Sequence, residues 1–389
     1  GSKCSNFFVF QYFLITFSVR SGLLLKRTNP VSINSRRDPR GYPISCRIDG
    51  CDPPTYYWIM SMYSNIVVTR WLTEYPIDPH LDTKDLGFGR IRMSSDHTEF
   101  FIKKSSCDVV CMGEGEITIS KLMEVLENKT TLDNVPGIAW LENGKLKQTP
   151  RAPLIHDLDS LPTIPYESFP MHYYRMLRLA KAKATDFCFP LMSARGCSFK
   201  CTFCYRMDPG YRMRTPEPML DEVEMLHKDY GITYIAFQDD LLMSSVEHTE
   251  AVCREFLKRN LPIRWSCSGR LNYCSEELLQ LMKDAGCTFI NYGIESMDQK
   301  VLNNMKKGLR PEMIIRGVED TLKVGISPGL NFIFGNKGDN KETIKSSVDF
   351  MLKYDDFAQK RTIRPVTPYP GSPLYYDAID MGLLDKDNP

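Results

Sequence analysis

The sequence has no excess of charge of either sign. Its 389 residues include 49 lysines and arginines and 48 aspartates and glutamates, which gives a formal net charge of +1. A protein that binds nucleic acid needs a basic surface, and this balance indicates none. Low-complexity tracts are also absent, and 42% of the residues are hydrophobic. The composition is therefore that of an ordinary globular protein with packed cores.

Apolar runs long enough to span a membrane are missing. The run at residues 7–17 is eleven residues long, whereas a transmembrane helix needs about 20. We therefore expect no transmembrane segment. We interpret the run as a buried strand, or a strand plus a turn, in preference to a targeting or membrane-surface segment. Arg20 follows it without the small-residue pattern of a cleavage site.

The cysteines do not indicate a disulfide framework. They number 13, which is odd, and they are scattered along a chain long enough to form a core without cross-links. Free thiols in this number predict a reducing compartment, and we expect a cytoplasmic protein. Four isolated cysteines are interpreted as small core residues: Cys253, Cys267, Cys274 and Cys287.

Three cysteines stand close together, at Cys197, Cys201 and Cys204, in a C-x3-C-x2-C pattern. Thiolate is the preferred ligand of iron–sulfur iron, so one loop can hold three irons of a cubane cluster and leave the fourth open for chemistry. A structural zinc site is the main alternative. It usually has four ligands in paired groups, and no fourth cysteine or histidine follows at such spacing. The pattern favours a 4Fe-4S cluster.

This pattern, with the aromatic residue Phe203 before its last cysteine, resembles the signature of the radical S-adenosylmethionine (radical SAM) superfamily. The resemblance implies that the cysteines hold a 4Fe-4S cluster and that S-adenosylmethionine binds at the open iron. One electron then cleaves S-adenosylmethionine to a 5′-deoxyadenosyl radical. A small-molecule substrate and a one-electron donor such as flavodoxin or ferredoxin are also implied. Phe203 is expected to shield the cluster and contact adenine, or otherwise only to pack.

Strands and helices alternate in the second half of the chain. We expect strands at residues 187–193, 234–238, 263–268, 289–293, 329–334 and 360–365. Three intervening helices have start signals: Ser275 as a cap, Pro311 as a first residue, and a capping-box pattern from Asp339 to Glu342. Six strand–helix repeats predict parallel strands, and fewer than eight repeats predict an open, partial (β/α)6 barrel, which is the radical SAM fold.

Polar residues follow several of these strands. In parallel α/β folds the reactive residues lie at the carboxyl ends of the strands. The residues predicted on this basis to bind S-adenosylmethionine, with Phe203, are Gln238, Asp239, Asp240, Ser268, Arg270 and Glu295.

Two of these predictions have structural alternatives. Asp239 and Asp240 can accept hydrogen bonds from the methionine ammonium, where the radical SAM family has a Gly-Gly-Glu-type motif. Alternatively, one of them caps the helix near Ser245. The guanidinium of Arg270 suits the methionine carboxylate, or it forms an ion pair with Glu295. Glu295 can also accept hydrogen bonds from ribose hydroxyls.

An α/β segment is expected ahead of the barrel. Residues 107–112 predict a buried parallel strand, and residues 117–126 predict a helix. Asn143 and Gly144 are typical of a tight turn, which predicts a hairpin at residues 135–146. Strand, glycine turn and helix are half of a βαβ unit, so we expect a partial or degenerate Rossmann-like domain.

The Gly-Glu-Gly-Glu turn at residues 113–116 and the Asp-Leu-Asp-x-Leu-Pro linker at residues 157–162 resemble the end of a cobalamin-binding domain. Such a domain precedes the barrel in one radical SAM class. That class usually has an Asp-x-His-x-x-Gly loop, and Asp78-Pro-His80 matches only its first part, so the resemblance leaves cobalamin binding open. Residues 29–54 are expected to be loop. The chain divides into three parts: a poorly readable region at 1–92, a partial cobalamin-binding-like segment at 93–166, and the barrel at 167–389.

Together these features predict a radical SAM enzyme that acts on a small metabolite. Methylation of carbon is the commonest reaction that the resemblance implies, besides ring formation and rearrangement. One alternative is a radical SAM enzyme that works without cobalamin and only abstracts hydrogen. Another, of a different class, is a non-catalytic iron–sulfur redox or binding protein. The residues at the strand ends argue against the latter, because a protein that only holds a cluster needs no methionine site.

Overall fold

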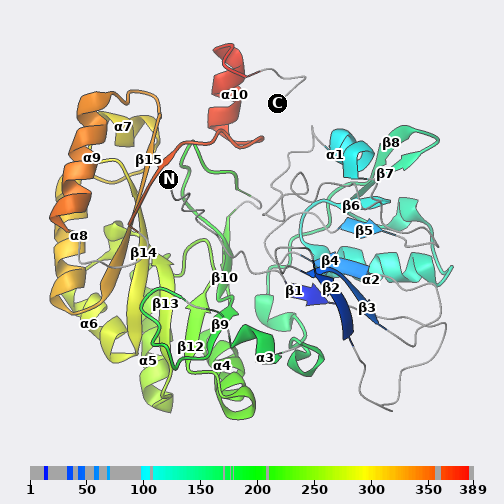
Figure 1. The fold of residues 1–389 in the computed structure, drawn as a ribbon, viewed down its shortest axis with the longest axis horizontal. Coiled ribbons are helices and arrows are strands. Elements are labelled where there is room, and N and C mark those ends of the chain that lie inside the picture. Colours follow the sequence, from blue (N-terminus) through cyan, green and yellow to red (C-terminus); the bar gives the residue numbers. More distant parts are fainter. Residues whose placement is uncertain are drawn as a thin grey trace. The chain divides into compact units, whose positions relative to one another are not determined.

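The chain forms two compact units, Gly1–Leu154 and Ile155–Pro389 (Figure 1). The structure, a computed structural model, describes residues 98–105, 108–169, 171–175, 177, 179–206, 210–354 and 361–384, together with the backbone of five short strands between residues 13 and 70. The division between the units falls earlier in the chain than the predicted boundary at residue 166.

The second unit is built on a sheet of six parallel strands. Its strands neighbour one another in chain order. They are β9 (Cys188–Leu191), β12 (Tyr234–Phe237), β13 (Arg264–Gly269), β14 (Cys287–Glu295), β15 (Ser327–Phe334) and β16 (Arg361–Pro365). All six predicted strands are thus confirmed, and their ends differ from the predicted ones by at most two residues. The parallel α/β character is confirmed as well.

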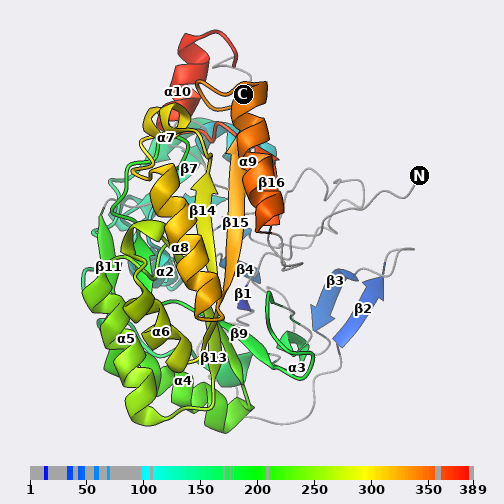
Figure 2. The same cartoon turned by 90° about the vertical axis from the view of Figure 1, so that its left-hand side faces the viewer.

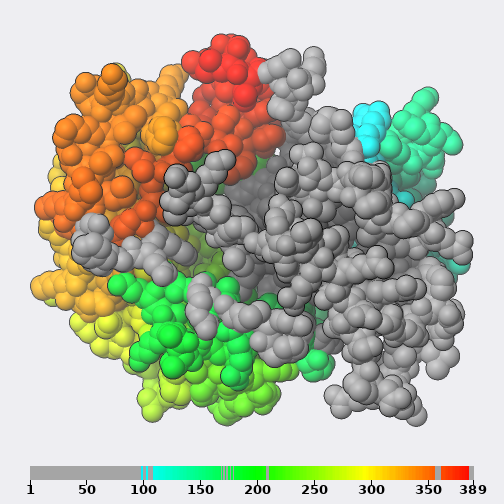
Figure 3. Space-filling view, in the orientation of Figure 1, coloured from blue at the N-terminus to red at the C-terminus, as the bar shows by residue number. Residues whose placement is uncertain are grey.

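Helices connect these strands. In chain order they are α4 (Pro216–Tyr230), α5 (Val246–Arg259), α6 (Glu276–Asp284), α7 (Gln299–Asn304), α8 (Pro311–Lys323) and α9 (Lys341–Lys353), with α3 (Met171–Tyr174) before the sheet and α10 (Pro373–Asp380) after it. Figure 2 shows α8 and α9 covering β14 and β15. Helix α10 lies at the surface (red in Figure 3), where Tyr376 and Met381 are exposed.

Two of the three predicted helix starts are confirmed. The hydroxyl of Ser275 accepts a hydrogen bond from the backbone N–H of Leu278, and Pro311 is the first residue of α8. The capping box predicted from Asp339 is wrong by one position. Asn340 is the cap, and its side chain and that of Thr343 bond each other's backbone N–H groups.

The first unit contains an antiparallel sheet. Its strands, in spatial order, are β1 (Phe13–Ile15), β4 (Tyr57–Met60), β5 (Val68–Arg70), β6 (Val109–Cys111), β7 (Ile138–Glu142) and β8 (Lys145–Gln148). Every neighbouring pair is antiparallel. The prediction that residues 107–112 form a parallel strand is therefore wrong, and the sheet differs from the expected Rossmann-like arrangement. β2 (Ile33–Arg37) and β3 (Pro43–Ile48) form a hairpin where loop was expected.

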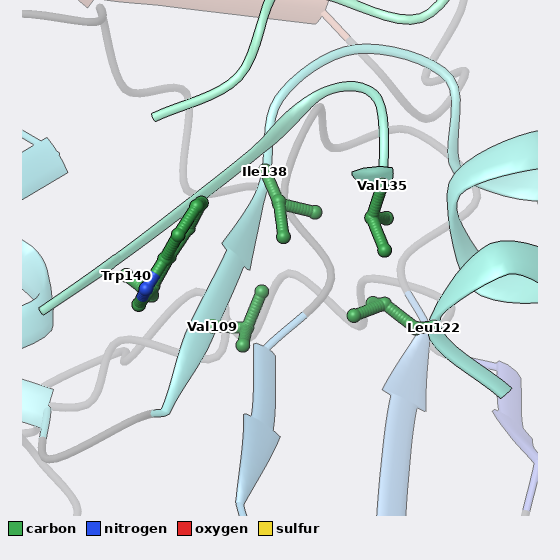
Figure 4. Close-up of a cluster of buried hydrophobic side chains, with 5 residues drawn as sticks. All are labelled: Val109, Leu122, Val135, Ile138 and Trp140. Atoms are coloured by element: carbon green, nitrogen blue, oxygen red, sulfur yellow. The ribbon is translucent and has the colours of Figure 1, made fainter. Parts of the chain in front are cut away.

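Helices α1 (Thr98–Ser105) and α2 (Gly115–Leu126) accompany this sheet, and α2 confirms the predicted helix. Figure 4 shows part of the core, where Leu122 of α2 meets Val109, Val135, Ile138 and Trp140.

The predicted hairpin is confirmed by β7 and β8. Its turn residues, Asn143 and Gly144, both have positive φ angles (52° and 76°), which the favoured two-residue hairpin turn requires.

Within the part of the chain that the structure describes, we find no helix both long enough and apolar enough to cross a membrane.

Candidate functional site

The three clustered cysteines lie on a loop that follows the first strand of the parallel sheet. Beyond β9 the chain forms a short hairpin, β10 (Ala194–Gly196) with β11 (Tyr211–Met213), and the cysteine loop lies between its two strands. Cys201 is buried, and Cys197 and Cys204 are partly buried. All three are free thiols. The hairpin therefore holds the two ends of the loop together.

Backbone hydrogen bonds fix the middle of this loop. The N–H of Thr202 donates to the carbonyl of Met305, at 2.9 Å, and the carbonyl of Thr202 accepts from the N–H of Leu374, at 3.0 Å. Met305 follows α7 and Leu374 belongs to α10. Two distant parts of the second unit thus hold the residue next to Cys201 in place.

Arg270, just after β13, contacts the loop directly. Its Nη1 atom lies 3.9 Å from the Sγ atom of Cys201, and its guanidinium lies over the Phe199 ring, 3.4 Å from the ring centroid. Nε donates to Asn272, and Nη2 donates to the backbone carbonyl of Lys307. This buried cation is well placed to stabilise negative charge on the cysteine sulfurs.

Glu295 is paired with Lys307 rather than with Arg270. The Nζ atom of Lys307 lies 2.9 Å from Oε1 of Glu295, and both side chains are less than a tenth exposed. The predicted alternative of an Arg270–Glu295 ion pair is therefore wrong. Glu295 ends β14 with a φ of +72°, an unusual conformation for a residue with a side chain. Strained residues of this kind cluster at functional sites.

Phe203 lies close to the same pair, because the Nζ atom of Lys307 is 5.8 Å from the centroid of its ring. Gly293 leaves space for the pair. A Cβ atom at position 293 would collide with Oε1 of Glu295 and lie 2.9 Å from Nζ of Lys307. The loop, the end of β14 and the segment after α7 therefore meet at one place.

Asp239 holds the chain just ahead of the loop. One carboxylate oxygen accepts from the backbone N–H groups of Ser193 and Ala194, at 2.7 and 2.9 Å, and the other accepts from the Ser193 hydroxyl. Burial raises the pKa of Asp239 to about 7, while these hydrogen bonds oppose the rise. The cofactor contact predicted for Asp239 stays a prediction.

Asp240 is exposed, and its charge helps to raise the pKa of Cys197. Burial is the main cause of that rise, and nearby Arg270 acts against it. Neither aspartate caps α5, because the cap is Ser245, so that alternative is wrong. Gln238 is partly buried, and its backbone N–H donates to the carbonyl of Leu191.

A stripe of neutral polar side chains crosses the sheet. Ser268 of β13 is in register with Asn291 of β14. The amide nitrogen of Asn331, on β15, donates to the side-chain oxygen of Asn291, at 2.8 Å, and its oxygen accepts from the Thr362 hydroxyl, at 2.8 Å. All four side chains are partly buried. Four neighbouring strands thus present hydrogen-bonding groups on one face.

Sequence reasoning missed several of these residues. Lys307 and Phe199 are absent from the predicted site, as are Ser193 and Tyr211, which lie beside the loop. Nothing in the sequence around Lys306-Lys307 indicates that the second lysine is buried. The contact of Phe199 with Arg270 depends on the tertiary fold. Among the described residues, no three His, Cys, Asp or Glu side chains are grouped closely enough to hold a single metal ion.

A parallel α/β sheet with three free thiols on the loop after its first strand has the arrangement of an iron–sulfur protein. Residues 191–351 match the family model described as the radical SAM superfamily. These 161 of the 389 residues resemble the radical SAM superfamily.

Curated relatives include an uncharacterized methyltransferase of Pyrococcus horikoshii, 32% identical over 291 residues, which cover 74% of this chain and 61% of the relative. Another is the cytidylyl-2-hydroxyethylphosphonate methyltransferase of Streptomyces wedmorensis, 28% identical over 330 residues, covering 75% of this chain and 61% of that protein. The chain thus spans about three fifths of the length of these two relatives.

A similar solved structure is the radical S-adenosylmethionine methyltransferase TsrM from Kitasatospora setae, solved with cobalamin and a [4Fe-4S] cluster bound. Its TM-score is 0.59 at 19% identity, with 74% of this chain and 56% of that chain covered. At this identity the likeness supports the fold.

Proposed function

We propose that this chain is a radical SAM enzyme that reductively cleaves S-adenosylmethionine and methylates or rearranges an unactivated carbon of a small metabolite. The observation that carries the proposal is the contact between Arg270 and Cys201 on a loop of three free thiols. The match of residues 191–351 to the radical SAM family model and the methyltransferase names of the two relatives support it. We infer that the parallel sheet is the partial (β/α)6 barrel of this superfamily.

The donor set fits a 4Fe-4S cluster. Cys197, Cys201 and Cys204 supply three thiols, the ligands that such clusters take, and Arg270 offsets their negative charge. When bound, the cluster supplies the electron that breaks a carbon–sulfur bond of S-adenosylmethionine. The protein's own part is to hold the three sulfurs, to orient the cofactor and to exclude water.

We assign the remaining predicted residues to different chemical groups of S-adenosylmethionine. We assign the methionine ammonium to Asp240, with Gln238 beside it, because both oxygens of Asp239 already accept hydrogen bonds from Ser193 and Ala194. Arg270 offers a guanidinium to the methionine carboxylate.

Three further assignments follow from the ends of the strands and the loop. Glu295 accepts from ribose hydroxyls, Phe203 contacts adenine, and Ser268 lies beside the cofactor at the end of β13.

The substrate is inferred to carry neutral hydrogen-bonding groups. Asn291, Asn331 and Thr362 form a hydrogen-bonded row on one face of the sheet. The amide nitrogen of Asn291 makes no hydrogen bond within the described part of the chain, so it can donate to a carbonyl or hydroxyl oxygen. Such a row suits a small polar metabolite better than a bare hydrocarbon.

Cobalamin has no assigned role in this proposal. Asp78 and His80 lie outside the described residues, and β6 pairs antiparallel with β5 and β7, unlike the parallel strand expected of a Rossmann-like domain. The described residues of the first unit therefore do not test whether the cofactor fits. Cobalamin stays possible, and the alternative is a radical SAM enzyme that uses hydrogen abstraction without cobalamin. An electron donor such as flavodoxin or ferredoxin and a cytoplasmic location stay predictions.

Anaerobic reconstitution with iron and sulfide tests the proposal. The wild type should bind about four irons and form 5′-deoxyadenosine from S-adenosylmethionine with dithionite. Cys201→Ala should lose both properties. Cys253→Ala, which changes a buried cysteine of α5, should keep both.

Two outcomes would change the assignment. An intact cluster without 5′-deoxyadenosine would indicate the redox or binding protein instead. Corrinoid that stays bound through gel filtration would support the cobalamin-dependent reaction, and its absence would support hydrogen abstraction without cobalamin.

A further inference from the structure

The Asp-Leu-Asp-Ser-Leu-Pro linker at residues 157–162 begins with a short turn that its own residues stabilise. Leu158–Ser160 forms a single 3-10 turn. The side chain of Asp157 caps this turn by accepting a hydrogen bond from the backbone N–H of Asp159, at 3.0 Å. The side chain of Leu158 is buried and anchors the turn. The local sequence thus fixes where the Asp159 carboxylate lies.

The Asp159 carboxylate holds the chain directly after β11. Its Oδ2 atom accepts hydrogen bonds from both the backbone N–H and the hydroxyl of Thr215, each at 2.8 Å. Its Oδ1 atom lies 3.5 Å from Nε of Arg214, in an ion pair. Three donors of two consecutive residues thus converge on one charged acceptor, and such hydrogen bonds are stronger than neutral ones. We call these contacts the Asp159 clamp.

Two further contacts fasten the linker to the same part of the second unit. Nη1 of Arg212, in β11, donates to the backbone carbonyl of Ile155, at 2.6 Å. The Tyr166 hydroxyl, near the end of the linker, donates to Glu222 of α4, which also forms an ion pair with Arg214. Tyr166 is only 1% exposed. The linker is therefore attached along its length.

Two different carboxylates thus hold the two ends of the cysteine loop. Asp239 accepts from Ser193 and Ala194, where β10 begins, and Asp159 accepts from Thr215, just beyond β11. Between these two points, β10 and β11 pair through three residues each. A two-stranded hairpin is marginally stable by itself. The hairpin therefore needs outside contacts to keep the loop closed.

We propose that Asp159 is a positioning residue of the iron–sulfur site, which keeps the C-terminal end of the cysteine loop closed so that the loop retains its cluster. The inference rests on the proposed function. Asp159 acts through Arg214 and Thr215, because these residues continue β11, whose partner β10 ends directly before Cys197. Without the Asp159 clamp the hairpin should open more often, and each opening exposes the iron to competing ligands.

An anaerobic challenge of the reconstituted protein with EDTA tests this inference. EDTA replaces the thiolates as iron ligands without any change of oxidation state, and the loss of visible absorbance gives the rate. Thr215→Ala removes the hydroxyl that donates to Asp159 but no helix-capping bond, because the Thr215 side chain makes none. The rate should rise roughly tenfold, the factor for one hydrogen bond to a charged group. Thr215→Ser keeps the hydroxyl and should keep the wild-type rate, whereas Asp159→Ala should raise the rate further.

Asp186→Ala is the matched control. The Asp186 carboxylate accepts from the same three kinds of donor, the backbone N–H of Lys183, the hydroxyl of Thr233 and the guanidinium of Arg264. It precedes β9, whereas the cysteine loop follows β9. The control should lower the free energy of unfolding in urea about as much as Asp159→Ala does, and it should leave the EDTA rate unchanged.

Hydrogen exchange of the protein without its cluster is a second measurement, independent of how well each variant assembles. Exchange in β11 should be faster in Thr215→Ala and Asp159→Ala than in the wild type, and unchanged in Asp186→Ala.

The outcomes are distinguishable. Faster cluster loss and faster exchange in the two clamp variants, with neither in Thr215→Ser or Asp186→Ala, support the inference. Wild-type rates in both clamp variants overturn it and leave the proposed function standing. A rise in Asp186→Ala as large as that in Asp159→Ala also overturns it, because the effect would then be general destabilisation. A wild type that assembles no cluster overturns the proposed function, and this inference with it.

Discussion

The Nη1 atom of Arg270 lies 3.9 Å from the Sγ atom of Cys201, and this contact joins the end of β13 to the cysteine loop. The same guanidinium lies over Phe199 and donates to Asn272 and to the carbonyl of Lys307. One planar cation thus satisfies four neighbours at once. A lysine could keep the charge but could not make these contacts together.

Arg270→Lys should therefore impair the site although the charge is kept. A hydrogen bond to a charged group contributes about 1.5–3 kcal/mol, so we expect the rate of 5′-deoxyadenosine formation to fall roughly tenfold to a hundredfold. The iron bound after reconstitution should also fall. Arg254→Lys is the control, because Arg254 is exposed on α5 and pairs with Glu250 at the surface. Equal rates for the two variants would contradict the role of Arg270.

The buried pair of Lys307 and Glu295 should matter for stability. Lys307→Ala leaves the Glu295 carboxylate buried without its partner, a change that costs about 3–5 kcal/mol. The free energy of unfolding in urea measures the loss. Lys345→Ala breaks an exposed pair with Asp349 and should cost only about 0.5 kcal/mol or less. Similar losses in the two variants would show that the buried pair is not stabilising.

Arg270 and Glu295 were predicted because they follow parallel strands, whose carboxyl ends all lie at one edge of the sheet. The sequence could not show that Glu295 forms its ion pair with Lys307 rather than with Arg270. Lys306 and Lys307 are neighbours of the same type, and only the fold shows that Lys307 is buried while Lys306 is exposed. Partner choice here depends on packing between segments distant in sequence, which local patterns do not encode.

The predictions that depend on interactions between sequence neighbours are confirmed. The helix cap at Ser275 and the turn at Asn143-Gly144 each involve no more than four consecutive residues. Asp339 and Asn340 are both good caps, so composition could not choose between them. The direction of β6 was predicted wrongly because a short buried strand has the same apolar residues whether its neighbours are parallel or antiparallel.

Gly293→Ala should disturb the Lys307–Glu295 pair without removing either charge. The added Cβ would collide with Glu295, and the φ angle of Gly293 is not in the left-handed region, so the effect is steric. We expect a loss of about 1–3 kcal/mol in the free energy of unfolding. The loss should be smaller in a Lys307→Ala background, where the crowded ammonium is gone. A double-mutant cycle measures this coupling. If the losses in free energy of unfolding from Gly293→Ala and Lys307→Ala were strictly additive, the Cβ atom would not be crowding the pair.

Asp239 should make stability fall as pH rises. Burial raises its pKa from 3.8 to about 7. Between these values the folded state holds a proton that the unfolded state has lost, so folding takes up a proton and higher pH opposes it. This difference between the folded and unfolded pKa values corresponds to a loss of roughly 4 kcal/mol in the free energy of unfolding as the pH rises through this range. This sign is opposite to that of an ordinary salt-bridged carboxylate, whose stabilisation is lost at low pH.

Asp239→Asn isolates this effect because the amide cannot titrate. Its oxygen can still accept from the N–H groups of Ser193 and Ala194, and its nitrogen can donate to the Ser193 hydroxyl. Thermal unfolding at pH 5 and pH 8 should show a variant that gains stability relative to the wild type as pH rises. Asp349→Asn, at an exposed position on α9, should show no such gain. If both variants followed the wild type at the two pH values, Asp239 would have to be ionised throughout, and its hydrogen bonds with Ser193 and Ala194 would then outweigh its burial.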